Sequence, residues 1–246
     1  MYAKLARLAW QVAALKVGKG EKPIPTPQNF KVYESFSAFH ESGLIDSLCK
    51  AYQRVFRESN AWQEHHSCES ISKKLISQLS DSSVITLMMD DQNTVTGFCW
   101  GQITTIEQVV LDCQESISFS SFNENDRKKL SEQLKKHISP KNIVFIHELG
   151  ILSEHRSGIK PLQFLLRPIF ELGNKNEIKQ LLWWTSKKSE AYTLSFLFGM
   201  ENLLSVNDIV FMYSPNYTHL LKILRCFDPQ KIAGLLRKSS LSKQER

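Results

Sequence analysis

The stretch that decides the fold is E-L-G-I-L-S-E-H-R-S-G-I-K-P-L-Q-F-L-L, which runs from Glu148 to Leu166. It starts inside an apolar segment, residues 142–152, that is typical of a buried strand, and it passes through a short polar loop into a helix predicted over residues 160–172. Apolar residues recur along this helix at intervals of three and four, at Leu162, Leu165, Leu166, Ile169 and Phe170. A second apolar segment, residues 177–185, follows. Strand, helix and strand in this order predict a parallel, right-handed crossover.

Three residues bear on where this helix begins and ends. Pro161 fits the first turn, where its missing N–H costs nothing. Pro168 lies inside the helical pattern and predicts a kink or an early end. Gly173 is predicted as the C′ residue that stops the helix.

The remaining segments also alternate between strand and helix patterns. Before the central stretch we predict a strand, two helices, a hairpin and a polar surface helix, at residues 30–36, 44–55, 71–79, 84–103 and 124–137. After it we predict a helix that Ser186 or Ser189 caps and that ends at Gly199, then a strand and two helices, at residues 208–214, 217–226 and 229–237. The predicted fold class is α/β, with a mixed (α+β) sheet flanked by helices.

The chain is predicted to hold one domain with two appendages. Residues 1–29 combine an amphipathic helix with a linker that carries three prolines. The domain itself spans residues 30–215, and residues 216–246 form a C-terminal helical extension with a polar tail. The first 19 residues bear Lys and Arg without an acid, which is compatible with a transit peptide or a membrane-surface helix. We favour an accessory helix packed on the domain.

Composition excludes several protein classes. The 246 residues are 42% hydrophobic and 23% charged, which excludes a disordered, collagen-like or disulfide-scaffold chain. A net charge of +6 favours anionic partners but is too small for a dedicated nucleic-acid binder, so no nucleic-acid partner is expected. No apolar run is long enough for a transmembrane segment. The five scattered cysteines predict a reducing, cytoplasmic location and neither a disulfide framework nor a metal site.

The loop before the central helix has the features of an anion site. Backbone N–H groups at a helix N-terminus lack partners, and the helix dipole adds partial positive charge. Arg156 and Lys160 add full charges, and Gly158 lets the backbone approach a ligand closely. This combination suits a pyrophosphate. The alternative is an ordinary strand–helix turn, which every parallel crossover contains, and local physics leaves both open.

The same residues resemble a known family. The order of elements and the segment L-G-I-L-S-E-H-R-S-G-I-K resemble the GNAT superfamily of acyl-CoA-dependent N-acetyltransferases, whose signature is a strand ending in Leu-x-Val and an Arg/Gln-x-x-Gly-x-Gly/Ala loop that opens a helix. The matching residues are Leu149, Ile151, Arg156, Gly158 and Ile159. A second block resembles the family's Ala-x-x-Leu-Tyr-x-x-x-Gly-Phe helix at Ala191, Leu194, Gly199 and Met200. The resemblance covers residues 30–214.

The resemblance implies that an acyl-CoA binds where the middle of the sheet splays. The pyrophosphate would lie on the amides of Arg156, Ser157, Gly158, Ile159 and Lys160. The pantetheine arm would pair like an extra strand with Leu149, Gly150 and Ile151. An amine would then attack the thioester directly, without a covalent enzyme intermediate and without a metal.

The sequence departs from the family pattern at two places. The loop is one residue shorter, and its last small residue is replaced by Lys160, whose side chain can crowd the phosphate or bind it. Where many members carry a Tyr as proton donor to the leaving thiolate, this chain has Ser195, a poor donor that can still hydrogen-bond the sulfur. Tyr192, one turn earlier, is the alternative donor. We favour a packing role for Tyr192 at the edge of the core.

Glu148 is the predicted general base for the attacking amine. A carboxylate within an apolar strand is desolvated, which raises its pKa toward a useful range. The alternative is that Glu148 lies at the edge of the sheet and pairs with a Lys or Arg. In an ideal strand His147 points to the opposite face, so only one of the two would face the substrate.

Other candidate residues favour structural roles. His65, His66 and Cys68 lack a second cluster that would complete a metal site. Trp183 and Trp184 place one indole on each face of a strand, one in the core and one toward a pocket wall. Cys99 in an apolar strand is expected to be a core residue.

The predicted function is transfer of an acetyl group from acetyl-CoA, or another acyl-CoA, to the amine of a small molecule or peptide. One alternative is a longer acyl donor, either a long-chain acyl-CoA or an acyl carrier protein. Another is a GNAT fold without activity that serves as a binding module. The resemblance implies that the acceptor contacts residues 44–81 and the segment from Asp208 onward, and a homodimer is a further expectation.

Overall fold

The computed structural model describes residues 29–59, 62, 64–80, 82–115, 122–138, 142–156 and 159–226. Several predictions concern residues outside these ranges. They are the N-terminal helix with its linker, the helix over residues 229–237, the polar tail, and the loop residues Ser157 and Gly158.

Within the described part of the chain, the strands form one seven-stranded sheet in the order β1-β2-β3-β4-β5-β7-β6. The strands are β1 (Asn29–Tyr33), β2 (Ser83–Met89), β3 (Val95–Thr105), β4 (Asn142–Ile151), β5 (Leu181–Ser186), β6 (Glu201–Val206) and β7 (Ile209–Ser214). Only β4 and β5 pair in parallel, and the other neighbours are antiparallel. The mixed sheet and the parallel crossover are confirmed.

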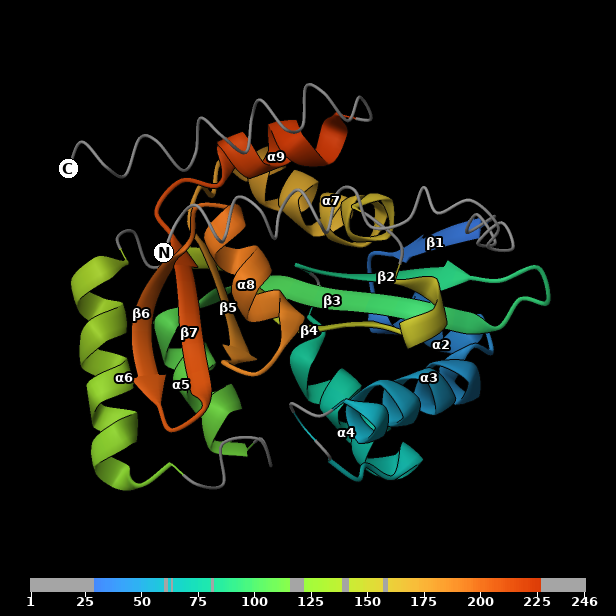
Figure 1. Ribbon diagram of the computed structural model, residues 1–246, viewed down its shortest axis with the longest axis horizontal. Coiled ribbons are helices and arrows are strands. Elements are labelled where there is room, and N and C mark those ends of the chain that lie inside the picture. The colour runs from blue at the N-terminus through green and yellow to red at the C-terminus, as the bar shows by residue number, and fades with distance from the viewer. Residues whose placement is uncertain are drawn as a thin grey trace, which may run out of the picture.

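Helices cover both faces of the sheet (Figure 1). They are α2 (Phe36–Glu41), α3 (Ile45–Glu58), α4 (Cys68–Gln78), α5 (Ile106–Glu115), α6 (Glu124–His137), α7 (Lys160–Lys175), α8 (Glu190–Leu197) and α9 (Thr218–Arg225). The buried stripe of α7 and the apolar side of α9 share one core cluster with β4, β5 and β7. On the opposite face, α2, α3 and α4 pack against β2 and β3. Beside them on that face, α5 and α6 pack against β4, β5 and β7.

Three elements were not predicted: α2, α5 and β6. Helix α5 follows β3 without a break at Ile106, so its start carries no turn residue that would separate it from a long strand. Strand β6 is mostly exposed, and among the described strands it pairs with β7 alone. An edge strand of this kind lacks the apolar run by which its neighbours were found.

Helix α7 runs past both of its predicted stops. It contains Pro168 and continues to Lys175, where Asn176 forms the C-cap, so the predicted end at Gly173 is wrong. Gly173 is buried inside the helix, and a Cβ on it would overlap the Tyr217 hydroxyl and the Val144 side chain. Its glycine therefore serves close packing between α7, β4 and the segment that enters α9. Burial of the apolar stripe outweighs the single hydrogen bond that Pro168 removes.

The structure corrects the expectation about cysteines, because Cys49 and Cys68 form a disulfide. Cys49 lies on α3 and Cys68 begins α4, and their Cα atoms are 5.3 Å apart. The two positions are 19 residues apart in sequence, so no short motif marks them. Only the packing of the two helices brings them together. Cys99 and Cys113 are buried free thiols.

None of the helices in the described ranges combines the length and the apolar character that crossing a membrane requires.

Candidate functional site

A β-bulge in β4 shapes the site. Trp100 of β3 pairs with Glu148, whereas the next residue, Gly101, pairs with Ile146, so His147 is the extra residue on β4. The bulge interrupts the alternation of side chains along the strand. As a result, His147 and Glu148 line the same pocket. The expectation that only one of them could face it is wrong, because it assumed an ideal strand.

Strands β4 and β5 separate in the middle of the sheet, at the position of the bulge. Strands β4 and β5 pair only where residues 144–146 face residues 181–183. Strand β4 continues to Ile151 and β5 to Ser186, without pairing between these later residues. From His147 onward, β4 therefore has a neighbouring strand on its β3 side alone, within the residues described. The splayed middle that the resemblance implied is present here.

Glu148 projects from the opening toward the helices of the second face. Its side chain is only 3% exposed, and its Oε1 lies 2.5 Å from the Nζ of Lys74 on α4. The same ammonium donates to the Tyr52 hydroxyl oxygen at 3.0 Å. We call Lys74, Glu148 and Tyr52 the Glu148 cluster.

Burial raises the pKa of Glu148, and the charge of Lys74 opposes the rise. The direction of this shift agrees with the sequence prediction. The alternative for Glu148 was a position at the edge of the sheet with a Lys or Arg partner, and only the partner is correct. Glu148 does have a lysine partner, but β4 lies in the centre of the sheet.

The Glu148 cluster lies against aromatic side chains. Tyr52 is fully buried and stacks against Phe98 and Trp100 with ring centroids 5.4 Å and 5.7 Å away. Burial, followed by the Glu148 charge, raises the pKa of Tyr52 well above its ordinary value. The Tyr52 hydroxyl is therefore protonated at neutral pH, and it hydrogen-bonds Glu148 as well as Lys74.

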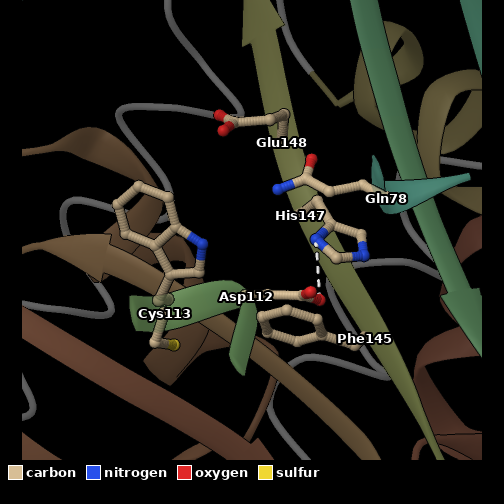
Figure 2. Close-up of a pocket in the computed structure, with 7 residues that line it drawn as sticks. Gln78, Asp112, Cys113, Phe145, His147 and Glu148 are labelled. Carbon is tan, nitrogen blue, oxygen red and sulfur yellow. Dashed lines mark ion pairs between the residues drawn. The ribbon is translucent and has the colours of Figure 1, made fainter. Parts of the chain in front are cut away.

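A small pocket lies between Glu148 and α5 (Figure 2). It is lined by Gln78, Asp112, Cys113, Phe145, His147, Glu148 and Trp184. It has room for about one water molecule. In the close-up, Glu148 and His147 project from the same strand, with Gln78 beside them and Asp112 below.

His147 is a neutral imidazole in this pocket. Its Nδ1 lies 3.8 Å from Asp112 Oδ2, and burial with the nearby Lys74 charge lowers its pKa to about 3. Its Nε2 is buried and has no hydrogen-bond partner among the described residues. The other oxygen of Asp112 accepts a hydrogen bond from Gln108 at 2.8 Å.

The start of α7 has the predicted anion-site features in part, because the Arg156 amide, predicted to contact the pyrophosphate, donates instead to the Ser153 carbonyl at 3.4 Å. Ile159 is the N-cap, and its apolar side chain makes no capping hydrogen bond, so the N-cap residue leaves the first-turn amides without a side-chain acceptor. Lys160 is exposed at the first helical position. Arg156 Nε donates to the Ile151 carbonyl at 2.8 Å, and one terminal nitrogen lies 3.8 Å from Glu190 at the start of α8. Arg156 thus links the end of β4 to α8.

Among the residues predicted to pair with pantetheine, Leu149 is half-buried, and Gly150 and Ile151 are buried. They pair with β3 residues 97–99 on one side. A Cβ at Gly150 would overlap the Phe98 ring, so glycine is required there by packing.

The two predicted proton donors lie on α8, in different surroundings. Ser195 is fully buried, donates to the Ala191 carbonyl at 2.7 Å and accepts from the Trp183 indole N–H at 2.9 Å. Its one proton is therefore used inside the fold. Tyr192 is half-buried and packs edge-on against Phe196 with ring centroids 5.0 Å apart. No hydrogen bond involves its hydroxyl within the described part of the chain, so of the two it is the freer donor.

Other candidates have the expected structural surroundings. Trp183 belongs to the core on the α7 face, whereas Trp184 lines the pocket on the opposite face. His66 Nε2 lies 2.7 Å from Glu64, and its ring stacks edge-on against Tyr52. Burial raises the pKa of the Cys99 thiol, as a core cysteine requires.

Sequence reasoning missed Lys74, Tyr52, Gln78 and Asp112. The first three lie on the predicted helices over residues 44–55 and 71–79, but they are at least 70 residues from Glu148, and no spacing rule connects them. Asp112 lies on α5, a helix that was not predicted. Of the residues 44–81 that were expected to contact the acceptor, Gln78 lines the pocket. Asp112 and Cys113 of α5 also line it.

No protein-family profile matches the sequence, and no curated protein matches it either. Solved structures are similar in fold. The CoA-dependent acyl-homoserine lactone synthase BjaI has 12% identity and a TM-score of 0.52, with 86% of this chain and 98% of that chain covered. An arylalkylamine N-acetyltransferase from Aedes aegypti has 16% identity and a TM-score of 0.48, with 76% and 99% covered.

A GNAT-family acetyltransferase from Listeria monocytogenes has 12% identity and a TM-score of 0.42, with 75% of this chain and 94% of that chain covered. At such identities a likeness bears on the fold alone. Together with the mixed sheet and its opening between β4 and β5, the likeness to BjaI identifies the architecture: the chain has the GNAT fold.

Proposed function

We propose that the protein is an acyltransferase that moves an acetyl group from acetyl-CoA to the amine of a small molecule or peptide. The observation that carries this proposal is the opening between β4 and β5, with a buried carboxylate, Glu148, beside it. A strand edge without a neighbour supports the proposal, because it offers backbone N–H and C=O groups to an extended ligand.

The residues at the end of the opening suit the diphosphate of CoA. The N-cap residue of α7, Ile159, makes no side-chain hydrogen bond to the first-turn amides, and a helix N-terminus favours an anion. Arg156 precedes that turn and Lys160 is its first residue, and both carry a positive charge. A bound phosphate would compete with Glu190 for Arg156. Because that pair is solvent-exposed, little free energy opposes the exchange.

In the proposed reaction, the acceptor enters from the face that carries the pocket. Its amine loses a proton to Glu148, directly or through the one water that the pocket accommodates, and attacks the thioester carbonyl. The new C–N bond forms as the C–S bond breaks, and the CoA thiolate takes a proton. Tyr192 is our candidate for that proton donor, since the Ser195 proton is held by Ala191.

A longer acyl donor is the second candidate. It is supported by the structure of BjaI, which was solved with SAM and isopentyl-CoA. An acyl carrier protein as donor, a homodimer and a cytoplasmic location also remain predictions. A reducing compartment would keep Cys49 and Cys68 as thiols, so labelling of free thiols in intact cells tests the location.

Thermal unfolding with CoA thioesters tests the proposal. At a ligand concentration 100 times Kd, binding stabilises the fold by about 2.7 kcal/mol, which corresponds to a rise in Tm of about 5–10 °C. Arg156→Gln should require about tenfold more CoA for the same shift, because it removes one charge-assisted phosphate contact. Lys128→Gln, on the surface helix α6, is the matched control.

The outcomes separate the candidates. Equal shifts with all chain lengths support an acetyl donor, and shifts that grow with chain length support a long acyl donor. The absence of any shift with any thioester would refute the enzyme proposal and leave a binding module. Glu148→Gln should keep the CoA shift and lower turnover about 100-fold or more, once an acceptor is in hand.

A further inference from the structure

Lys74 brings a primary amine of the protein itself to the proposed base. Its Nζ lies 2.5 Å from Glu148 Oε1 and 3.0 Å from the Tyr52 hydroxyl oxygen, and it stands 5.5 Å above the centre of the Tyr52 ring. The side chain is 15% exposed, so the amine is mostly withdrawn from solvent. These contacts hold the amine where an acceptor amine must stand in the proposed reaction.

The position of Lys74 relative to the pocket supports this comparison. Gln78 lies one turn further along α4, on the same helix face, and lines the pocket. Glu148 lines the pocket from β4 (Figure 2). Lys74 thus contacts the Glu148 carboxylate from the helix layer. Glu148 itself belongs to the part of β4 that no longer pairs with β5, so its carboxylate also lies beside the opening in the sheet.

We propose that Lys74 is a self-acylation site, which accepts an acyl group from a CoA thioester bound to the same molecule. The proposal rests on the proposed function, because it uses the same thioester and the same base. The Lys74 ammonium transfers one proton to the Glu148 carboxylate, and the resulting amine bonds to the thioester carbonyl carbon. As the C–S bond breaks, the nitrogen gives up its second proton to the departing CoA thiolate, and the first proton passes from Glu148 to solvent. The products are free CoA and an Nε-acyl-lysine.

Two physical features favour Lys74 over other lysines. Its amine is held against a buried carboxylate that lies where β4 and β5 separate, so the reaction gains from proximity to the proposed thioester site that a solvent lysine lacks. Burial also raises the pKa of that carboxylate, which makes it a stronger proton acceptor than an exposed glutamate. Lys73 is the natural comparison. It is the adjacent residue, 74% exposed, and pairs with the exposed Glu69 at 2.7 Å.

The test incubates the full-length protein with acetyl-CoA and follows acetylation by intact mass, with fragmentation that separates Lys73 from Lys74. We expect one acetyl group per chain at Lys74, at least about tenfold faster than at Lys73. The rate constant should not change when the protein is diluted tenfold, since donor and acceptor belong to one molecule. Lys74→Arg should abolish this product, and Lys73→Arg should leave it unchanged.

The base assignment has its own variant. Glu148→Gln should slow acetylation of Lys74 about 100-fold or more while the stabilisation by acetyl-CoA persists. If it does not slow, Glu148 takes no part in the step.

Failure of this inference is distinguishable from failure of the proposed function. If acetyl-CoA raises Tm but Lys74 stays unmodified, or Lys73 is acetylated as fast, self-acylation is refuted and CoA binding stands. If neither acetyl-CoA nor a longer acyl-CoA stabilises the protein or modifies Lys74, the proposed function itself is refuted.

Discussion

Removing the cation of the Glu148 cluster gives the sharpest test of the buried ion pair. In Lys74→Met, the Glu148 carboxylate stays buried, 3% exposed, without its counter-ion. Breaking a buried pair from one side costs about 3–5 kcal/mol, and we expect about 3 kcal/mol because the Lys74 side chain keeps some solvent contact. For a domain of this size, that lowers Tm by about 6–12 °C.

The pH dependence of this loss identifies its cause. Burial already raises the folded-state pKa of Glu148, and without Lys74 the pKa rises further. The folded variant then binds a proton more tightly than the unfolded chain, so lowering the pH stabilises it. The deficit relative to wild type should therefore be largest above neutral pH and shrink toward pH 5.

Urea unfolding of wild type, Lys74→Met and Lys74→Met/Glu148→Gln at pH 5 and pH 8 measures these differences. The double variant removes the buried charge and should recover most of the lost stability. Lys73→Met is the control, because Lys73 is adjacent to Lys74 but exposed, and it should change the free energy of unfolding by about 0.5 kcal/mol or less. A deficit that is equal at both pH values, or a double variant no better than the single one, would refute the argument.

Three further predictions concern packing and protonation. Gly173→Ala should destabilise by about 1–3 kcal/mol in urea unfolding, because its Cβ overlaps the Tyr217 hydroxyl. Ser195→Ala should cost about 1–3 kcal/mol, because it leaves the buried Trp183 N–H without an acceptor, and CoA-induced stabilisation should be unchanged. His147 has a folded pKa of about 3, so it is protonated only on unfolding, and stability should fall by up to about 1.4 kcal/mol per pH unit below pH 6.5. His147→Asn should remove that part of the slope.

Each of these predictions has an outcome that contradicts it. A Gly173→Ala variant as stable as wild type would show that α7 can shift away from Tyr217. Loss of CoA binding in Ser195→Ala would place that hydroxyl in the site rather than in the core. An unchanged acid slope in His147→Asn would mean that the imidazole is not neutral in the folded protein.

The site was predictable where it depends on one segment of the chain. Glu148 lies in an apolar strand, and apolarity of that strand is sufficient to predict burial and a raised pKa, both of which the structure shows. Lys74 is a different case, since it lies 74 residues earlier on a helix with other polar positions. Nothing local distinguishes it from Lys73, which points to solvent.

Gly173 and the two cysteines illustrate the same limit. A glycine near the end of a helical pattern is read as a stop, but here the missing Cβ makes room for Tyr217, a residue on another segment. Cys49 and Cys68 carry no motif, and they meet only because α3 and α4 pack together.

The sequence by itself determined the order of most strands and helices, the mixed sheet and the anion-favouring start of α7, because periodicity, capping and charge act over a few neighbouring residues. Tertiary structure alone decided that β4 bulges at His147, that β4 and β5 separate after Ile146, and that Lys74 meets Glu148. Strand register and ion pairing depend on segments that are distant along the chain. They are decided by the free energy gained when those segments are buried against each other.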